Sequence, residues 1–275
     1  MAELNKEYEI VPVSKFSFGA KELLRNRELL YFFIWRDIKI RYKQTLLGIA
    51  WVILQPLLLM MVFSYVLAAR FNQDLNGIDY GTFVLGGLLM WNIFSSALAN
   101  AGQGMVSNAN IIKKIYFPRL IIPLSAVAVS LFDFLFATII YIVVLIYYQT
   151  PIHFTGLLFL LPALILTATA ALGSGSLIAA LNVKYRDFRY ILPFLIQTMM
   201  FVTPVFYPIC SSCGISSYLF ALNPMYAPVQ LFRMHLEGSA IQAELIGISI
   251  AFNLILLMAG LIVFRKMESY FADIA

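Results

Sequence analysis

Long segments without a charged residue constrain this chain more than any other feature. No charge occurs between Lys43 and Arg70 or between Asp79 and Lys113, and residues 120–183 contain only one charged side chain. A helix needs about 20 apolar residues to cross the roughly 30 Å hydrocarbon core of a membrane. Charged residues make up 12% of the 275 residues, against about 25% in soluble proteins. The chain is therefore predicted to be an integral membrane protein.

The expected fold is all-α with six transmembrane helices. A polar cluster around Pro151 divides the third charge-free segment into two spans. The predicted spans cover residues 47–69, 82–104, 120–148, 155–181, 191–207 and 245–264. They define a cytoplasmic N-terminal segment over 1–46, a six-helix domain over 47–264 and a cytoplasmic tail over 265–275.

The basic residues orient these helices. Seventeen of the 19 lysines and arginines fall in segments on one side of the predicted membrane, and only Arg70 and Arg233 fall on the other. Loops rich in lysine and arginine remain in the cytoplasm. Both termini are therefore expected to be cytoplasmic, and the positions of the cations argue against a nucleic-acid partner.

Residues 208–244 are expected to form a re-entrant or interfacial helical hairpin on the outer face. The apolar part of this segment is interrupted by Pro224 and Pro228, and a seventh crossing would place Arg265 and Lys266 outside. Irregular backbone at membrane depth is tolerated where it packs against protein or water. A plain extracellular loop is the alternative.

The N-terminal segment contains seven apolar residues, 29–35, with charges on both sides. This stretch is too short to span a membrane, so it is predicted to be a helix lying in the cytoplasmic interface. Residues 1–20 are expected to be a poorly ordered lead-in. The segment 1–44 lacks the apolar core and small-residue cleavage site of a secretory signal peptide.

The chain lacks the sequence patterns of a catalytic or nucleotide-binding site. It contains no G-x-x-x-x-G-K-[ST], H-E-x-x-H or G-x-S-x-G motif and no paired carboxylates within a predicted span. Its two histidines, His153 and His235, are both expected outside, and they offer little for a metal or general-base site. An intramembrane enzyme is therefore disfavoured.

Asp133 is the one acidic residue within a predicted span, near mid-membrane by its distance from Arg119. A charge at mid-membrane costs about 2.5–3.5 kcal/mol, so such residues are candidates for function. Asp133 could be part of a proton or cation relay. The alternative is a carboxyl group that is hydrogen-bonded to neighbours such as Ser130 or faces water. No lysine or arginine of a predicted span is available to pair with it.

Small and sulfur-containing residues suggest local packing features. Cys210 and Cys213 are expected on the outer face, where an oxidising periplasm allows a disulfide; two free thiols are the alternative, and one C-x-x-C pair is a weak metal signal. Residues 173–176 are glycine and serine, which allow close approach of helices. The many aromatic residues of the outer half fit an ordinary interfacial belt, or in part a path for sugar rings.

Two cytoplasmic loops combine basic and apolar residues, over 111–119 and 182–189. Either could dock into a soluble partner, although a loop on the cytoplasmic side is expected to be basic in any case.

Four segments resemble one known family, the membrane subunits of ABC-2 type exporters of lipid-linked polysaccharide such as O-antigen, capsule or teichoic acid. The resemblance is carried by residues 36–56, 111–123, 182–188, and 203–208 together with 222–226. Their order and spacing agree with the family over about residues 25–270. The Cys210/Cys213 pair is not part of the family pattern.

The resemblance implies a homodimer of this chain with two copies of a separate ABC ATPase subunit, which holds ATP and Mg, and no cofactor on this chain. It also assigns roles to several groups of residues. The residues implied for ATPase coupling are Lys113, Lys114, Ile115, Tyr116, Phe117, Pro118 and Arg119. Those implied for the interfacial gate are Arg36, Lys39, Arg41 and Tyr42. Those implied for the channel lining are Trp51, Gln55, Phe63, Met199, Met200, Phe201 and Phe206, and those for the outer gate are Asn223, Pro224 and Met225.

The implied substrate is a lipid-diphosphate-linked glycan, moved from the cytoplasmic to the periplasmic face of the bacterial inner membrane. Arg36, Lys39 and Arg41 would attract its phosphates, or merely the anionic membrane lipids. The outer C-x-x-C pair favours a periplasm, and hence O-antigen over teichoic acid. An ABC-2 exporter of drugs or other lipids, or a proton-coupled secondary transporter using Asp133, remain the alternatives.

Overall fold

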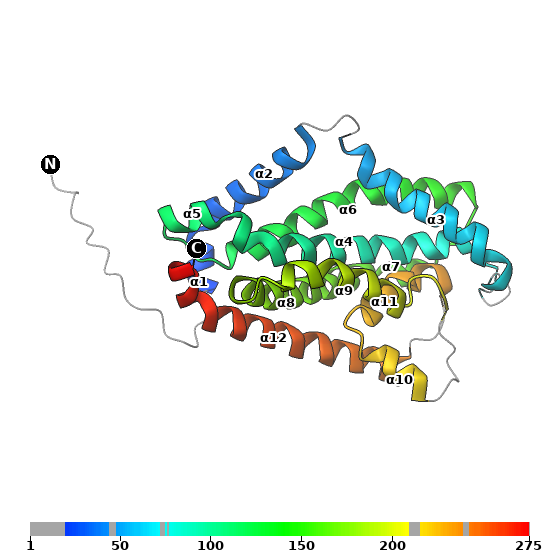
Figure 1. Cartoon of the computed structure of the whole chain (residues 1–275). Helices are drawn as coiled ribbons and strands as arrows, with labels where there is room; N and C mark the ends of the chain where they lie inside the picture. The colour runs from blue at the N-terminus through cyan, green and yellow to red at the C-terminus, as the bar shows by residue number, and fades with distance from the viewer. Residues whose placement is uncertain are drawn as a thin grey trace.

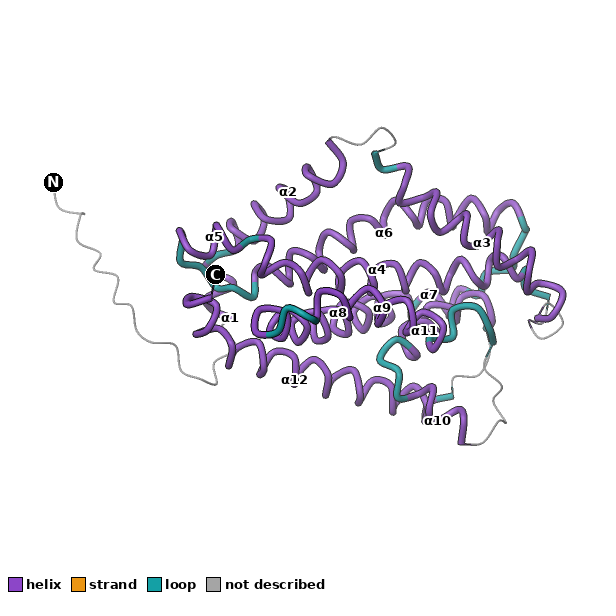
Figure 2. The backbone as a smooth tube through the Cα atoms, viewed as in Figure 1, coloured by secondary structure: helices purple, strands orange, loops and turns teal. Residues whose placement is uncertain are grey.

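The chain forms a bundle of helices in a computed structural model (Figure 1), which describes residues 20–43, 48–71, 75, 77–208, 215–238 and 242–274. Twelve helices and no strands occur within these residues, so the predicted all-α fold is confirmed for them (Figure 2). The helices are α1 (Ala20–Arg25), α2 (Arg27–Lys43), α3 (Ala50–Phe71), α4 (Tyr80–Ser107), α5 (Ala109–Lys114), α6 (Ile121–Tyr147), α7 (Phe154–Leu157), α8 (Leu160–Lys184), α9 (Phe188–Val202), α10 (Ile215–Ala221), α11 (Tyr226–Glu237) and α12 (Ala243–Ile274).

Helix α4 forms the centre of the bundle. It packs against α3, α6, α8, α9 and α11, and it is the most buried of the long helices. Helix α12 packs on the far side of α8 (Figure 1). The described parts of the two chain ends meet, because Glu22 of α1 and Glu268 of α12 line the same small cleft.

Five segments are long and apolar enough to cross a membrane, and they agree with five of the six predicted spans. They are Ala50–Phe71, Tyr80–Ser107, Ile121–Tyr147, Phe154–Lys184 and Ala243–Glu268. The remaining predicted span, the fifth in chain order at 191–207, corresponds to the shorter helix α9, which has 15 residues. Helix α12 continues through the expected domain boundary at 264–265 without a break.

Helix α9 ends early because of the pair Thr203–Pro204. The residue before a proline is driven out of the helical region by a clash with the proline ring. Thr203 is accordingly extended, with φ −77° and ψ 137°, and the chain turns over residues 203–207.

Helices α10 and α11 form a hairpin whose tip lies among the ends of α8 and α12. The backbone N–H of Ala227 donates to Ser249 Oγ of α12 at 3.1 Å, and Asn253 Nδ2 of α12 donates to the Pro224 carbonyl oxygen at 3.4 Å. Helix α11 also packs against α8. The far end of α11 contacts the loop before α7, where the His153 N–H donates to the His235 carbonyl oxygen at 2.9 Å. The segment between α9 and α12 therefore folds as a helical hairpin packed against the bundle, and its re-entrant or interfacial position in the membrane stays a prediction.

Helix α2 runs along the first half of α6. Near its start, Phe33 packs against Phe117 with ring centroids 5.4 Å apart. In the next turn, Asp37 accepts a hydrogen bond from Ser125 of α6 at 3.5 Å, and near its end Arg41 forms an ion pair with Asp133. Helix α2 therefore runs along the side of the bundle (Figure 1), and its place in the cytoplasmic interface stays a prediction.

Candidate functional site

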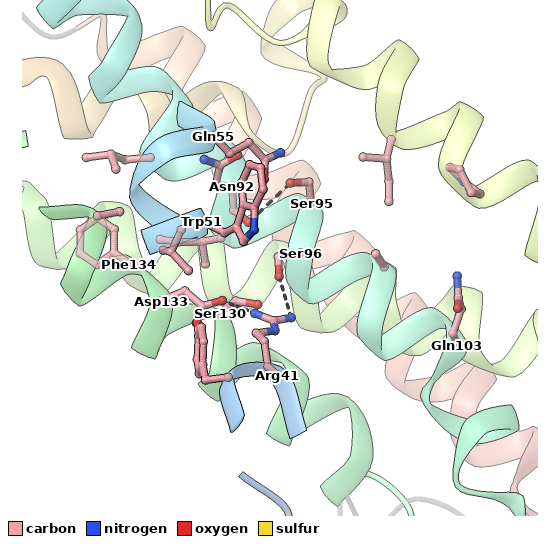
Figure 3. A pocket seen from close by; sticks show the side chains of 18 of the residues that line it. Arg41, Trp51, Gln55, Asn92, Ser95, Ser96, Gln103, Ser130, Asp133 and Phe134 are labelled. Carbon is pink, nitrogen blue, oxygen red and sulfur yellow. Dashed lines mark hydrogen bonds and ion pairs between the residues drawn. The ribbon is translucent and has the colours of Figure 1, made fainter. Parts of the chain in front are cut away.

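A cavity of about 650 Å³ opens between the end of α2 and helices α3, α4, α6 and α9. Side chains from four of these helices point into it (Figure 3). Its polar lining residues are Arg41, Tyr42, Gln55, Asn92, Ser95, Ser96, Gln103, Ser130 and Asp133, and its larger apolar ones include Trp51, Phe134 and Leu192. A mixture of amides, hydroxyls and one indole suits a ligand with both polar and apolar faces.

The central helix supplies most of the neutral polar groups. Asn92, Ser96 and Gln103 are separated by four and seven residues, a spacing that places them on one face of a helix. This face of α4 is turned toward the cavity, whereas its other faces are buried by α3, α6 and α8. We did not single out these residues from the sequence, although their helical spacing was visible there.

Asp133 is paired with two side chains from α2. Arg41 Nη1 forms an ion pair with Asp133 Oδ2, and the Tyr42 hydroxyl donates to Asp133 Oδ1. Burial, reinforced by the hydrogen bond to Asp133, raises the pKa of Tyr42. Arg41 lies on α2, outside every predicted span, so the expectation that no lysine or arginine of a span pairs with Asp133 is not contradicted. This partner from outside the spans was not identified from the sequence. Ser130, the expected partner, donates instead to the Ala126 carbonyl oxygen at 3.0 Å.

Asp133 lies near the middle of α6, which runs from Ile121 to Tyr147. It lines the same cavity as Gly48 and Trp51, which lie just before and within the first turn of α3. Its position near mid-membrane stays a prediction. The ion pair with Arg41 reduces the cost of keeping this carboxylate ionised.

The other cations expected at the interfacial gate lie outside the cavity. Arg36 forms an ion pair with Asp37 at 2.7 Å and covers the ring of Phe33 at 4.5 Å. Lys39 is exposed, and its ammonium group lies 5.1 Å from the centroid of the Trp35 ring. The structure therefore brings only Arg41 and Tyr42 of this group to the cavity.

The residues expected to line the channel fall into three groups. Trp51 and Gln55 line the cavity. Phe63 stacks on the buried Phe206 with centroids 3.7 Å apart, so this pair fills space between α3 and the turn after α9. The remaining three lie on α9, where Met199 and Met200 are partly buried and Phe201 is exposed.

The residues expected at the outer gate form the tip of the α10–α11 hairpin. Asn223 Nδ2 donates to Thr203 Oγ1 at 2.9 Å, and Asn223 Oδ1 accepts from the Met225 N–H at 2.9 Å. The carbonyl oxygen of Pro224 accepts from Asn253 at 3.4 Å, and Met225 is completely buried. These residues join the hairpin to the turn that follows α9.

Arg233 of α11 stabilises the same turn, a role that the sequence did not reveal. Its fully buried guanidinium donates to the carbonyl oxygens of Phe83, Pro204 and Val205 at 2.6–3.2 Å. It also lies 3.5 Å from the centroid of the Phe83 ring. The carbonyl oxygens of Pro204 and Val205 lie beyond the end of α9, so they have no partners within that helix, and the Arg233 guanidinium donates hydrogen bonds to them instead.

The loop expected to couple to an ATPase is only partly exposed. Lys113, Lys114, Ile115 and Tyr116 are exposed at the end of the bundle where α5 and the C-terminal part of α12 lie (Figure 1). Phe117 is buried against Phe33, and Arg119 donates to the Glu268 carbonyl oxygen. Pro118, partly buried, lies between these two anchors. The exposed part is a basic tip of four residues, Lys113–Tyr116.

The cysteines expected to form a disulfide, Cys210 and Cys213, lie outside the described residues. Within the described part of the chain, no group of three or more histidine, cysteine, aspartate or glutamate side chains is arranged to hold a metal ion.

Comparison with known proteins identifies the family. The profile of the ABC-2 type transporter family matches residues 28–236. The O-antigen export system permease protein RfbA of Myxococcus xanthus is 29% identical over 257 residues, covering 92% of this chain and 97% of that protein. A protein of the same name from Klebsiella pneumoniae is 28% identical over 248 residues, with 90% and 95% coverage.

A polysialic acid transport protein is also similar. The polysialic acid transport protein KpsM of Escherichia coli is 26% identical over 243 residues, covering 85% of this chain and 91% of that protein. The family match confirms the resemblance found in the sequence. It also identifies the chain as a transport component without a catalytic domain. The chain is a multi-pass membrane protein that belongs to the ABC-2 type transporter family.

Proposed function

We propose that this chain is the membrane subunit of an exporter of lipid-diphosphate-linked polysaccharide, and that O-antigen is its substrate. The glycan would pass from the cytoplasmic to the periplasmic face of the bacterial inner membrane. In this arrangement α9 is the fifth of six crossings, both termini are cytoplasmic, and the hairpin of α10 and α11 closes the outer end. The names of the similar proteins support a polysaccharide as cargo, O-antigen in RfbA and polysialic acid in KpsM.

The observation that carries this proposal is the position of the cavity between two uncovered helix faces. On α3, the exposed residues Trp51, Leu58, Val62 and Tyr65 follow one another at helical spacing. On α9, the exposed residues Tyr190, Phe194 and Phe201 do the same. Both helices line the cavity. A second copy of the chain facing these surfaces would convert two such cavities into one path with polar and aromatic walls.

The energy source is expected to be a partner protein. The chain contains no phosphate-binding loop, and its membership in an ABC transporter family implies an ABC ATPase. We assign the basic tip Lys113–Tyr116 to the contact with this ATPase, two copies of which would serve one dimer. Phe117 and Arg119 fix the base of the tip to α2 and α12.

Affinity purification of the full chain from gently solubilised membranes of its native host tests this assignment. We expect an ATPase subunit with a phosphate-binding loop to co-purify in equal amount. Substitution of Lys113 and Lys114 by glutamate should remove most of it and cause the polysaccharide to accumulate inside the cell. The control variant carries the same charge change at Arg27 and Lys43, both exposed on α2, and should retain partner and export.

The outcomes separate the rival functions. Stable recovery of the chain alone, under conditions that preserve other ABC complexes, would contradict the proposal and return attention to ion coupling through Asp133. If the ATPase co-purifies but loss of the complex leaves the amount of surface polysaccharide unchanged, the chain would instead belong to an exporter of drugs or other lipids.

A further inference from the structure

We propose that Arg41 is a phosphate-binding side chain held by Asp133 in the empty cavity, and that a diphosphate headgroup takes the place of this carboxylate when it binds. The inference rests on the proposed function, since it assigns the place where the lipid-diphosphate end of the substrate is recognised. It goes beyond an attraction of phosphates by interfacial cations, because it singles out one cation and gives it a partner that must be displaced.

The charges of the cavity point to this residue. Among the described residues that line it, Arg41 and Asp133 are the only ones with formally charged side chains. Arg36 and Lys39 of the same helix lie outside, one paired with Asp37 and the other over Trp35. An anion that enters the cavity therefore meets a single cation.

The geometry of the ion pair leaves the guanidinium accessible. The Arg41 side chain is 30% exposed, whereas that of Asp133 is 14% exposed, so the arginine lies nearer the open side. Arg41 Nη2 also lies 3.4 Å from Ser96 Oγ. A guanidinium has five N–H donors arranged as a fork that fits phosphate oxygens. It can therefore exchange one oxyanion for another with a small rotation of its side chain.

Tyr42 makes this exchange feasible for Asp133. A buried carboxylate that loses its only donor is strongly destabilised. The Tyr42 hydroxyl donates to the oxygen of Asp133 that Arg41 does not contact. Asp133 thus retains one hydrogen bond from α2 when Arg41 turns toward a ligand, and the contact between α2 and α6 is preserved.

The neutral lining residues fit what adjoins a diphosphate in such a substrate. Ser96 of α4 provides a hydroxyl group next to Arg41, and the amide groups of Gln103 of α4 and Gln55 of α3 line the same cavity (Figure 3). The exposed indole of Trp51 offers a flat apolar surface for a sugar ring or an isoprenoid unit. The chemical class recognised is therefore a phosphate or diphosphate that links a lipid to a polar group.

Binding to the full transporter complex in nanodiscs of phosphatidylcholine tests the inference. Geranylgeranyl diphosphate is titrated, and quenching of tryptophan fluorescence reports its binding. We expect Arg41→Gln to weaken binding by about tenfold, the scale of one charge-assisted contact. Asp133→Asn should instead tighten binding several-fold, because the amide still accepts from Tyr42 but no longer holds Arg41. The matched control Lys43→Gln, on the exposed end of α2, should bind as the wild type does.

Further ligands distinguish the source of the phosphate. Inorganic pyrophosphate competing with the lipid probe would support recognition of the headgroup itself, whereas geranylgeraniol, which has no phosphate, should not compete. Phosphatidylglycerol competing as well as the diphosphate would overturn the assignment and indicate an ordinary anionic-lipid site.

The variants also separate recognition from structure. If Asp133→Asn weakens binding as much as Arg41→Gln, the ion pair only fixes α2 to α6 and the inference is wrong. An equal loss in Lys43→Gln would likewise overturn it in favour of general surface charge. Arg41→Lys, which keeps the ion pair, serves as the folding control. Co-purification of the ATPase is measured on the same samples, so failure of this inference is distinguishable from failure of the exporter proposal.

Discussion

Gly173 of α8 and Gly260 of α12 lie against each other, with no room for a side chain on either. A Cβ atom added to Gly173 would lie 2.6 Å from the Cα atom of Leu257, and one added to Gly260 would overlap the carbonyl group of Gly173. The expectation that residues 173–176 allow close helix approach is confirmed at this contact. The two long helices therefore meet through their backbones. Because no hydrophobic effect drives helices together within a lipid bilayer, close van der Waals packing at small residues holds such helices together.

We expect Gly173→Ala to destabilise the protein by about 1–3 kcal/mol, because overpacking forces the two backbones apart. Thermal unfolding of the detergent-solubilised chain, followed by size-exclusion chromatography, measures the effect. Gly247→Ala in α12 is the control, since no atom lies within 4 Å of the added Cβ atom. Equal unfolding temperatures for the two variants would contradict the close contact.

Arg233→Met should destabilise the packing of α11 against α4 and the turn after α9 by about 3–5 kcal/mol, as expected when one partner of a buried polar network is removed. The carbonyl oxygens of Pro204 and Val205 would lose the donors that Arg233 provides. Arg233→Lys should also be destabilising, because an ammonium group cannot reproduce the planar fork of donors. Arg70→Gln, at an exposed arginine of α3, is the control. A wild-type unfolding temperature for Arg233→Met would refute this role.

Phe33→Ala should loosen α2 from the bundle. Removing a buried phenyl ring costs about 3–5 kcal/mol, and Phe33 is 1% exposed in its contact with Phe117. Limited trypsin digestion of the protein in nanodiscs should then cleave α2 faster at its basic residues. The neighbouring Phe32 is 58% exposed, so Phe32→Ala should leave the digestion rate unchanged. Equal rates in both variants would show that Phe33 is not an anchor.

Acidification should weaken the packing of α11 through His235. Burial lowers the pKa of His235 below its ordinary value of 6.5, although the bond to the Phe232 carbonyl oxygen partly opposes this. Tyr141 lies 2.9 Å away from its Nε2 atom. The unfolded chain therefore binds more protons below pH 6.5, so the contribution is complete above that pH and falls as the pH decreases through the folded pKa.

Unfolding of the wild type and of His235→Gln at pH 7.5 and pH 5.5 checks this dependence. The wild type should lose more stability than the variant, by at most about 1.4 kcal/mol for each pH unit below 6.5. The difference between the two proteins removes the contributions of the other titrating groups. Equal losses in both would contradict a role for this imidazole.

The long helices could be predicted from the sequence because a membrane excludes charge from a whole segment at once. The windows between Lys43 and Arg70 and between Asp79 and Lys113 contain α3 and α4. The early end of α9 was not predicted, although Thr203–Pro204 is a local signal for it. Hydropathy reports the average of a segment, and it does not register a single residue that breaks the helix.

The polar contacts were harder to predict because they join distant parts of the chain. Arg41 and Asp133 are 92 residues apart, and Arg41 lies on α2, outside every predicted span, so the charges within the spans do not indicate this pair. Arg233 was counted as a cation of an outer loop, since the sequence does not show which carbonyl groups lack partners. Phe117, by contrast, belongs to a motif that the sequence singled out, but its burial against Phe33 depends on where α2 lies.

The central position of α4 has a consequence for biosynthesis. Among the five long helices, α4 is both the least hydrophobic and the most enclosed by protein. The ribosome completes it before α6 and α8, the two helices that cover most of its surface. Until they arrive, the amide groups of Asn92 and Gln103 face lipid or the insertion machinery without the cavity that they later line. We therefore expect α4 to be released into the bilayer only after α6 and α8 have been made.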